Sequence, residues 1–358
     1  MFKCGYLSHG MYVSFGLKGD VLPCCYASKN TPSGKKYKTT NILNGPLVTK
    51  LRKQALENKV PDICDGCMKK EEITGFSPRL SNYYFNDNTV KEVISEEDVR
   101  YIQVKLSNVC NFQCTICSAY DSHLIGKEEG HSNPLQLIDD DLYNELKEKL
   151  PKMSNLQLII FSGGETFYNS KKLIDLLDYI PDTVKTVAMH TNGSLFNKPI
   201  LDRLNEFKKT VLSFSFDGSG RFFEYQRRNG KWNIAFDNLK RIKENYSKIF
   251  LQCNNTITNT TLINLPDFIK EMQPYFSEMN IHFIEHPEYY QINTVKPEVL
   301  KEIKSKINDN MIIKNIDYAL NNPASDDSVK HFWKRVLYLN NKNHNIENFI
   351  PEIKEIIR

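Results

Sequence analysis

The stretch that decides the fold reads YIQVKLSNVCNFQCTIC and covers residues 101–117. Residues 101–107 form an apolar run of strand length, and a Cys-x3-Cys-x2-Cys motif follows almost directly. Three thiolates at this spacing can bind three corners of one cuboidal iron-sulfur cluster, with Cys110, Cys114 and Cys117 as ligands. No fourth cysteine lies nearby in the sequence, so one metal position stays open for a substrate, as in catalytic zinc sites. The spacing predicts a reactive metal centre, and the alternative is three small buried thiols.

From about residue 100 onward, apolar runs of strand length alternate with amphipathic segments of helix length. This alternation is typical of βα units around a parallel sheet, so the sequence predicts an α/β fold. Six strands and four of the intervening helices are predicted. The strands are 101–107, 156–162, 186–190, 211–216, 249–254 and 280–284, and the helices are 171–180, 199–207, 234–242 and 265–272.

Polar and glycine-rich motifs follow the predicted strands where each strand ends. The carboxyl ends of parallel strands are where barrel enzymes gather their chemistry. The cysteine motif follows the first strand, and Gly163, Gly164 and Glu165 follow the second. Later strands end at Asn192, Asp217 and Asn255, whose polar side chains are candidates to bind a ligand. His190 lies at the end of the third strand. Near the end of the sixth strand lie His282, Glu285, His286 and Tyr289.

The cysteine motif and the later Ser-Gly-Gly-Glu of residues 162–165 resemble the radical S-adenosylmethionine (SAM) superfamily, whose signature is Cys-x3-Cys-x-aromatic-Cys. Ile116 stands at the aromatic position. The resemblance implies a partial (β/α)6 TIM barrel and a 4Fe-4S cluster whose fourth iron is chelated by the amine and carboxylate of SAM. It also implies that one electron cleaves SAM to a 5'-deoxyadenosyl radical, which abstracts hydrogen from a C–H bond.

SAM contacts are predicted at several of these strand ends. Glycine at 163 and 164 lets the backbone approach the bound methionine closely, and Glu165 offers a carboxylate to its ammonium group. The resemblance implies that Ser213 and Ser215 reach the ribose. A guanidinium suits the SAM carboxylate because it makes paired hydrogen bonds, with Arg228 the first choice and Arg227 the alternate. Asn192 is a further candidate for cofactor binding, and Asp217 is a candidate for a position closer to the substrate. The alternative role for the serines and asparagines at these strand ends is that of solvated polar caps.

A second cysteine set lies near the N-terminus: Cys4, Cys24, Cys64 and Cys67. Four thiolates complete either a structural zinc site or a second iron-sulfur cluster. With Gly19 before Cys24, the set resembles the auxiliary 4Fe-4S modules called twitch or SPASM, although here the module precedes the barrel. Cys25 adjoins a proposed ligand and is able to replace it, and Cys253 lies in a predicted strand as a buried structural thiol.

Composition and charge bound the remaining possibilities. The 358 residues carry a formal net charge of +4 without a basic stripe, which does not indicate nucleic-acid binding. No signal peptide and no apolar run of bilayer length are present, so a cytoplasmic protein that does not enter membranes is expected.

Three parts are predicted: a twitch-like module with hairpin strands and a helix, the partial barrel, and a helical extension. Their ranges are 1–95 (strands 11–15 and 20–22, helix 41–56), 96–295, and 296–358 (helices 297–307, 328–339 and 346–357).

The predicted function is a radical SAM enzyme that abstracts hydrogen from a polar small molecule and completes an oxidation, an epimerisation or a bond formation. An electron donor such as flavodoxin or ferredoxin is the expected partner. The alternative within this class is modification of a ribosomally made peptide. The alternative from another class is a non-catalytic iron-sulfur electron carrier or redox sensor.

Overall fold

The computed structural model describes residues 2–15, 21–27, 41–61, 63–75, 77–80, 89–168 and 170–358. The chain folds into two compact units and passes between them more than once. The cysteine motif is shared, since Cys110 belongs to the first unit and Cys114 and Cys117 belong to the second. The first unit comprises Met1–Cys110, Ala119–His190 and Asn197–Val211; the second comprises Asn111–Ser118, Thr191–Phe196 and Leu212–Arg358.

The first unit is built on a sheet with the strand order β2-β1-β3-β4-β5. Strands β1, β3, β4 and β5 run parallel, and β2 is antiparallel to β1. The register places Ser14, Lys105 and Ser162 side by side at the carboxyl ends of β1, β3 and β4. The loops that follow β3 and β4 therefore start at the same level. The strands are β1 (Gly10–Ser14), β2 (Val21–Leu22), β3 (Tyr101–Lys105), β4 (Leu158–Ser162) and β5 (Thr186–Thr191).

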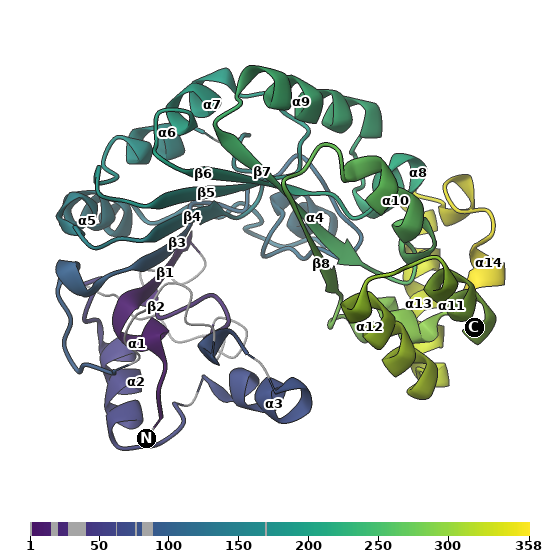
Figure 1. The fold of residues 1–358 in the computed structure, drawn as a ribbon, viewed down its shortest axis with the longest axis horizontal. Helices are drawn as coiled ribbons and strands as arrows, with labels where there is room; N and C mark the ends of the chain where they lie inside the picture. The colour runs from purple at the N-terminus through teal and green to yellow at the C-terminus, as the bar shows by residue number, and fades with distance from the viewer. Residues whose placement is uncertain are drawn as a thin grey trace. The chain divides into compact units, whose positions relative to one another are not determined.

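Helices cover one face of this sheet, as Figure 1 shows for α5, α6 and α7 beside β3, β4 and β5. Helix α5 begins where the Asp139 carboxylate accepts hydrogen bonds from the N–H groups of Asp141 and Leu142, which caps the free backbone donors of its first turn. Leu142 and Leu146, four residues apart, share the buried face. The helices are α1 (Gly5–His9), α2 (Pro46–Leu56), α3 (Asp65–Thr74), α4 (His123–Glu128), α5 (Asp140–Lys149), α6 (Lys171–Leu177) and α7 (Lys198–Leu204).

The second unit contains β6 (Thr210–Ser215, its first two residues excepted), β7 (Ile249–Ile257) and β8 (Glu278–Phe283), in that order. Strand β7 runs parallel to β8, and its side chains alternate strictly between buried and partly exposed. Cys253 and Asn255 lie on the buried face, while Gln252, Asn254 and Thr256 lie on the other. From Gln252 to Thr256 this second face of β7 is therefore polar and partly exposed, while Phe250 lies at its start.

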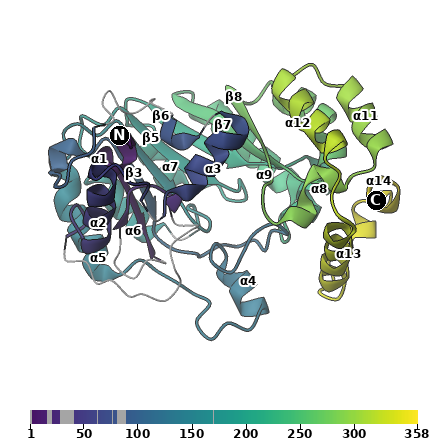
Figure 2. The ribbon, with the colours of Figure 1, turned by 90° about the horizontal axis from the view of Figure 1, so that it is seen from below.

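The helices of the second unit include a C-terminal group with its own apolar core, in which Ile312, Phe332 and Ile353 are fully buried. Figures 1 and 2 both show α11, α12, α13 and α14 gathered at this end of the chain. None of the helices that the structure describes is long and apolar enough to span a bilayer. The helices are α8 (Gly220–Gln226), α9 (Trp232–Asn245), α10 (Leu265–Met272), α11 (Pro297–Ser305), α12 (Asn310–Asn321), α13 (Asp326–Asn340) and α14 (Ile353–Ile356).

All six strands predicted from residue 101 onward are confirmed as β3 to β8, and the four predicted helices between them as α6, α7, α9 and α10. The continuous helix predicted for 346–357 is wrong: a short 3-10 turn at Ile346–Asn348 and α14 replace it. Pro351 lies between the two, and its missing N–H and its ring interrupt a helix. Of the predicted N-terminal hairpin, the turn containing Gly19 lies outside the described residues.

Candidate functional site

The loop after β4 approaches the cysteine motif through its two glycines. Gly163 and Gly164 have φ angles of +91° and +50°, in the left-handed region that glycine favours. A Cβ on Gly164 would lie 2.1 Å from the carbonyl oxygen of Val109, and one on Gly163 would lie 2.2 Å from Cγ of Lys105. The Glu165 N–H donates to the same Val109 oxygen at 2.8 Å. Glycine is therefore required here, and the loop is fixed to the residue before Cys110.

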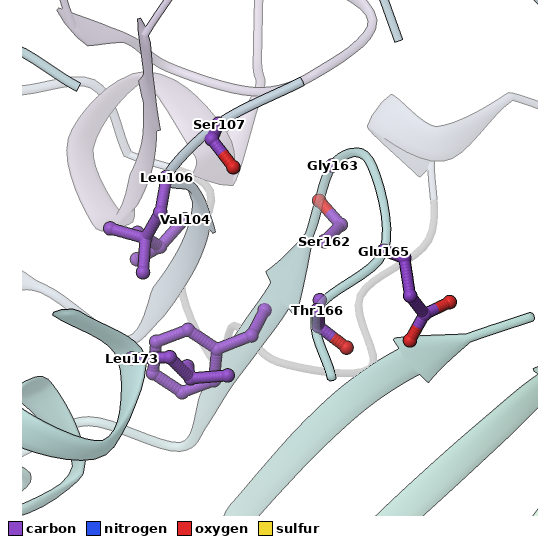
Figure 3. A pocket seen from close by; sticks show the side chains of 9 residues that line it. Val104, Leu106, Ser107, Ser162, Gly163, Glu165, Thr166 and Leu173 are labelled. Atoms are coloured by element: carbon purple, nitrogen blue, oxygen red, sulfur yellow. The ribbon is translucent and has the colours of Figure 1, made fainter. Parts of the chain in front are cut away.

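Glu165 is a buried carboxylate in this loop, with 2% of its surface exposed. Its Oε1 accepts a hydrogen bond from the Phe167 N–H at 3.0 Å. Figure 3 shows its carboxylate pointing away from Val104, Leu106 and Leu173, although Glu165 and these three residues all line the same small pocket. A buried carboxylate is stabilised by a cationic partner, so its environment suits the ammonium group of an amino acid.

In the first unit, Cys110 is buried and its N–H donates to Nδ1 of His123 at 3.2 Å. This places the His123 proton on Nε2. The Asn108 side chain closes the same loop, because its amide donates to the carbonyl oxygens of Ala119 and Pro134 at 3.1 and 2.8 Å. Sequence reasoning gave His123 no role, and no motif in the sequence marks it.

In the second unit, the segment that carries Cys114 lies along residues 226–228. The Gln113 N–H donates to the Arg228 carbonyl oxygen at 3.1 Å, and the Thr115 N–H donates to the Gln226 carbonyl oxygen at 2.9 Å. The Cys117 N–H donates to the Cys114 carbonyl oxygen at 3.1 Å and closes a turn. The backbone on both sides of Cys114 is thus fixed by hydrogen bonds.

A buried ion pair lies beside Cys114. Nε of Arg227 is 2.8 Å from Oδ2 of Asp217, and Nη1 of Arg227 is 3.9 Å from the Cys114 sulfur. Oδ1 of Asp217 accepts the Thr256 N–H at 3.0 Å, which fixes the carboxylate. Burial raises the pKa of the Cys114 thiol, and the Arg227 charge opposes that rise. Burial alone would lower the pKa of Arg227, but the Asp217 carboxylate raises it above its usual value. Arg227 is therefore a fixed cation.

The other predicted cofactor residues of the second unit differ in their surroundings. The Asn192 amide donates to Oδ1 of Asn111 at 3.0 Å, which ties the β5 loop to the residue after Cys110 in the sequence. The Ser213 hydroxyl donates to Oε1 of Gln252 at 2.7 Å, and Ser215 ends β6 partly exposed. Arg228 is buried, with 6% of its surface exposed.

Two residues of strand β7, Cys253 and Asn255, are buried inside the protein. The Asn255 amide donates to the Phe216 carbonyl oxygen at 2.8 Å and is fully buried. Cys253 is fully buried, as predicted, and burial raises the pKa of its thiol. Neither side chain is exposed to a ligand, so Asn255 is better described as a link between β6 and β7.

Of the four N-terminal cysteines, Cys4 belongs to a buried apolar cluster of the first unit, and Cys24 and Cys64 pack against that cluster. Burial raises the pKa of Cys4 to about 11, with a further contribution from the Cys67 thiol. Burial also raises the pKa of Cys64 to about 12, with contributions from Cys4 and Cys67. The pKa of Cys24 is raised by burial and by Cys4. Cys24, Cys64 and Cys67 each interact electrostatically with Cys4, and Cys25 follows Cys24 in the sequence.

Across the described ranges, no three or more His, Cys, Asp and Glu side chains are already arranged around a metal position. The fit of the two cysteine sets to iron is therefore judged from donor chemistry. Thiolate sulfur is the ligand that iron-sulfur clusters use. The first set supplies three thiols within residues 110–117, and the N-terminal set supplies four between residues 4 and 67. Zinc accepts the same four N-terminal ligands.

Residues 104–264 match the family model described as the Radical SAM superfamily. A curated relative, the radical SAM cyclopropyl synthase TigE of Paramaledivibacter caminithermalis, is 24% identical over 246 residues, which are 65% of this chain and 49% of that protein. The chain thus spans about half the length of this relative. Among solved structures, native anSMEcpe with bound AdoMet is 19% identical with a TM-score of 0.41, covering 62% of each chain. Streptococcus suis SuiB bound to the precursor peptide SuiA is 15% identical with a TM-score of 0.37, covering 72% of this chain and 58% of that one.

The matched range contains both Cys110-x3-Cys114-x2-Cys117 and the Gly163-Gly164-Glu165 loop that is bonded to the residue before Cys110. Residues 104–264 are therefore assigned as a domain of the radical SAM superfamily.

Proposed function

We propose that the chain cleaves SAM reductively and abstracts a hydrogen atom from a polar small molecule. The observation that carries the proposal is the contact between the Gly-Gly-Glu loop and Val109. There the left-handed backbone of Gly164 and the N–H of Glu165 meet the residue before the first cysteine of the motif. A loop that binds the methionyl group of SAM must lie beside the cluster ligands, and this one is bonded to their segment.

The proposed roles follow the donor chemistry. Cys110, Cys114 and Cys117 would hold a 4Fe-4S cluster, which would supply the electron for the reductive cleavage of SAM. Gly163 and Gly164 allow the methionyl group of SAM to approach the backbone closely, and the Glu165 carboxylate accepts hydrogen bonds from its ammonium group. Arg228 pairs with the SAM carboxylate, while Ser213, Ser215 and Asn192 line the nucleoside.

A polar substrate is supported by the accessible face of β7. Gln252 donates to Oε2 of Glu278 at 3.1 Å, and Asn254 accepts from Asn280 at 3.3 Å. The amide and carboxylate groups on this face can also hydrogen-bond a polar substrate, whereas a lipid would offer them no hydrogen-bonding partner. Among oxidation, epimerisation and bond formation, the name of the cyclopropyl synthase relative favours bond formation.

Replacing Glu165 by glutamine is expected to weaken SAM binding about 30-fold, because a hydrogen bond to a charged group contributes about 2 kcal/mol. Glutamine keeps the shape of the side chain and its contact with the Phe167 N–H. Anaerobic calorimetry on the reconstituted protein measures the change. Glu148→Gln, at an exposed glutamate of α5 paired with Lys152, is the control and should bind SAM like the wild type. An electron carrier or redox sensor would bind no SAM in any variant.

We also propose that Cys4, Cys24, Cys64 and Cys67 hold a second 4Fe-4S cluster in a twitch-like module. The mutual electrostatic influence of the four thiols supports one shared site. With all four thiolates bound, such a cluster relays electrons or supports the substrate pocket. Zinc at the same ligands is the competing assignment.

Metal analysis separates these assignments. A variant with alanine at Cys110, Cys114 and Cys117 should retain about four irons per chain after anaerobic reconstitution. Alanine at Cys4, Cys24, Cys64 and Cys67 should remove them and leave the other cluster in place. One zinc per chain, in place of iron, in the first variant would overturn the second cluster.

The finer architecture is part of the same proposal. The βα alternation supports a partial (β/α)6 barrel at residues 96–295, between a module at 1–95 and a helical extension at 296–358. We also propose that the enzyme is cytoplasmic and receives its electron from a flavodoxin or a ferredoxin. The oxygen sensitivity of iron-sulfur clusters is consistent with this location.

A further inference from the structure

In the Arg227–Asp217 pair, the guanidinium lies between the Asp217 carboxylate and the Cys114 sulfur. In the second unit, the backbone hydrogen bonds from Gln113 and Thr115 on either side of Cys114 reach the residues on either side of Arg227. This pairing brings Nη1 of Arg227 to 3.9 Å from the Cys114 sulfur. Asp217 lies at the other side of the guanidinium, 2.8 Å from Nε. The pair is a dipole with its positive end at the cysteine.

The pair is rigid and poorly solvated. The Asp217 side chain is fully buried and that of Arg227 is 14% exposed. The Thr256 N–H fixes the carboxylate, so the guanidinium is anchored to the junction of β6 and β7. A charge in such surroundings acts on its neighbours with little screening by water. The same anchoring commits Arg227 to Asp217 and Cys114, whereas the sequence left it as an alternate ligand of the SAM carboxylate.

We infer that Arg227 raises the reduction potential of the cluster by donating an N–H to the sulfur of Cys114, and that Asp217 positions it for this. The inference rests on the proposed 4Fe-4S cluster at Cys110, Cys114 and Cys117. Reduction adds one negative charge to the cluster, and a nearby fixed cation stabilises the reduced state more than the oxidised state. Hydrogen bonds to the ligand sulfurs act in the same direction.

The test is the midpoint potential of the cluster, measured by anaerobic titration followed by electron paramagnetic resonance. All variants carry alanine at Cys4, Cys24, Cys64 and Cys67, so one cluster is observed. The main variant is Arg227→Gln with Asp217→Asn, which removes the dipole without leaving a buried charge unpaired. At the midpoint of the parent, its ratio of oxidised to reduced cluster should rise about tenfold, equivalent to a shift of ~59 mV to more negative potential for one electron.

A second variant predicts the opposite sign. Asp217→Asn alone removes the negative end of the dipole and leaves the cation, so the midpoint should become more positive. Arg227→Lys keeps the charge and should stay closer to the parent than the double variant does. The control is Arg221→Gln, which removes a cation of the same unit that pairs with Glu352 on the C-terminal segment, and it should leave the midpoint unchanged.

The outcomes are distinct. Opposite shifts in the double variant and in Asp217→Asn support the inference. Equal midpoints in the parent and the double variant, or shifts of the same sign in the two, overturn it while the cluster itself stands. A parent protein that binds no 4Fe-4S cluster refutes the proposed function instead. Should the double variant not fold, the sign of the Asp217→Asn shift decides alone.

Discussion

Replacing Cys114 by alanine is expected to lower the release of 5'-deoxyadenosine from SAM at least about a thousandfold, equivalent to about 4 kcal/mol of activation free energy. Cys114 lies at the centre of the motif, on backbone that is fixed on both sides by residues 226–228. Without its thiolate the proposed cluster would lose one of its three ligands, and the fixed backbone cannot move another residue into its place. Chromatography of the anaerobic reaction, with dithionite as reductant, measures the product.

The matched control for this prediction is Cys253→Ala, in the same unit. Its thiol is fully buried in β7 and belongs to no cysteine motif. The change should cost some stability through the cavity it leaves, yet the iron content and the yield of 5'-deoxyadenosine per folded chain should match the wild type. Equal losses in the two variants would mean that unfolding, not ligand removal, explains the Cys114 result.

Gly164→Ala is expected to weaken SAM binding at least about 100-fold, close to 3 kcal/mol of binding free energy. The new Cβ would lie 2.1 Å from the Val109 carbonyl oxygen, so the loop must move away from the cysteine segment. That movement breaks the bond from the Glu165 N–H to Val109 and displaces the carboxylate proposed to hold the ammonium group. Equilibrium binding of SAM to the reconstituted variant, followed by calorimetry, measures the effect.

Gly130→Ala separates this steric effect from backbone strain. Gly130 has a φ of +77° in the first unit, and a Cβ there would meet nothing within 4 Å. Its replacement should cost about 1–2 kcal/mol of folding free energy, from the left-handed backbone alone, and leave SAM affinity intact. Weakened SAM binding in Gly130→Ala as well, by a similar factor, would argue that the Gly164 effect is a general loss of stability.

Much of the architecture follows from local sequence pattern. The apolar runs at 101–107 and 156–162 become β3 and β4, and the loops that follow them carry the cysteine motif and the glycines, as expected for parallel strands. The contact of Gly164 with Val109 confirms that the β4 loop meets the cysteine segment. Periodicity and turn residues are enough for this because each βα unit is local in sequence.

Contacts between distant segments were not predictable in the same way. β1 pairs in parallel with β3, about ninety residues away, and nothing in its five residues specifies that partner. His123 accepts from the Cys110 N–H only because α4 returns to the loop. Arg227 and Arg228 are neighbours of equal charge in the sequence, and only the three-dimensional pairing with Asp217 distinguishes them.

The most direct test of the central claim is anaerobic Mössbauer spectroscopy of the variant that lacks Cys4, Cys24, Cys64 and Cys67, reconstituted with iron-57, with and without SAM. The account predicts one 4Fe-4S cluster, in which a single iron site changes its spectrum when SAM is added. A protein without a tetranuclear cluster, or a cluster whose spectrum SAM leaves unchanged, would contradict it.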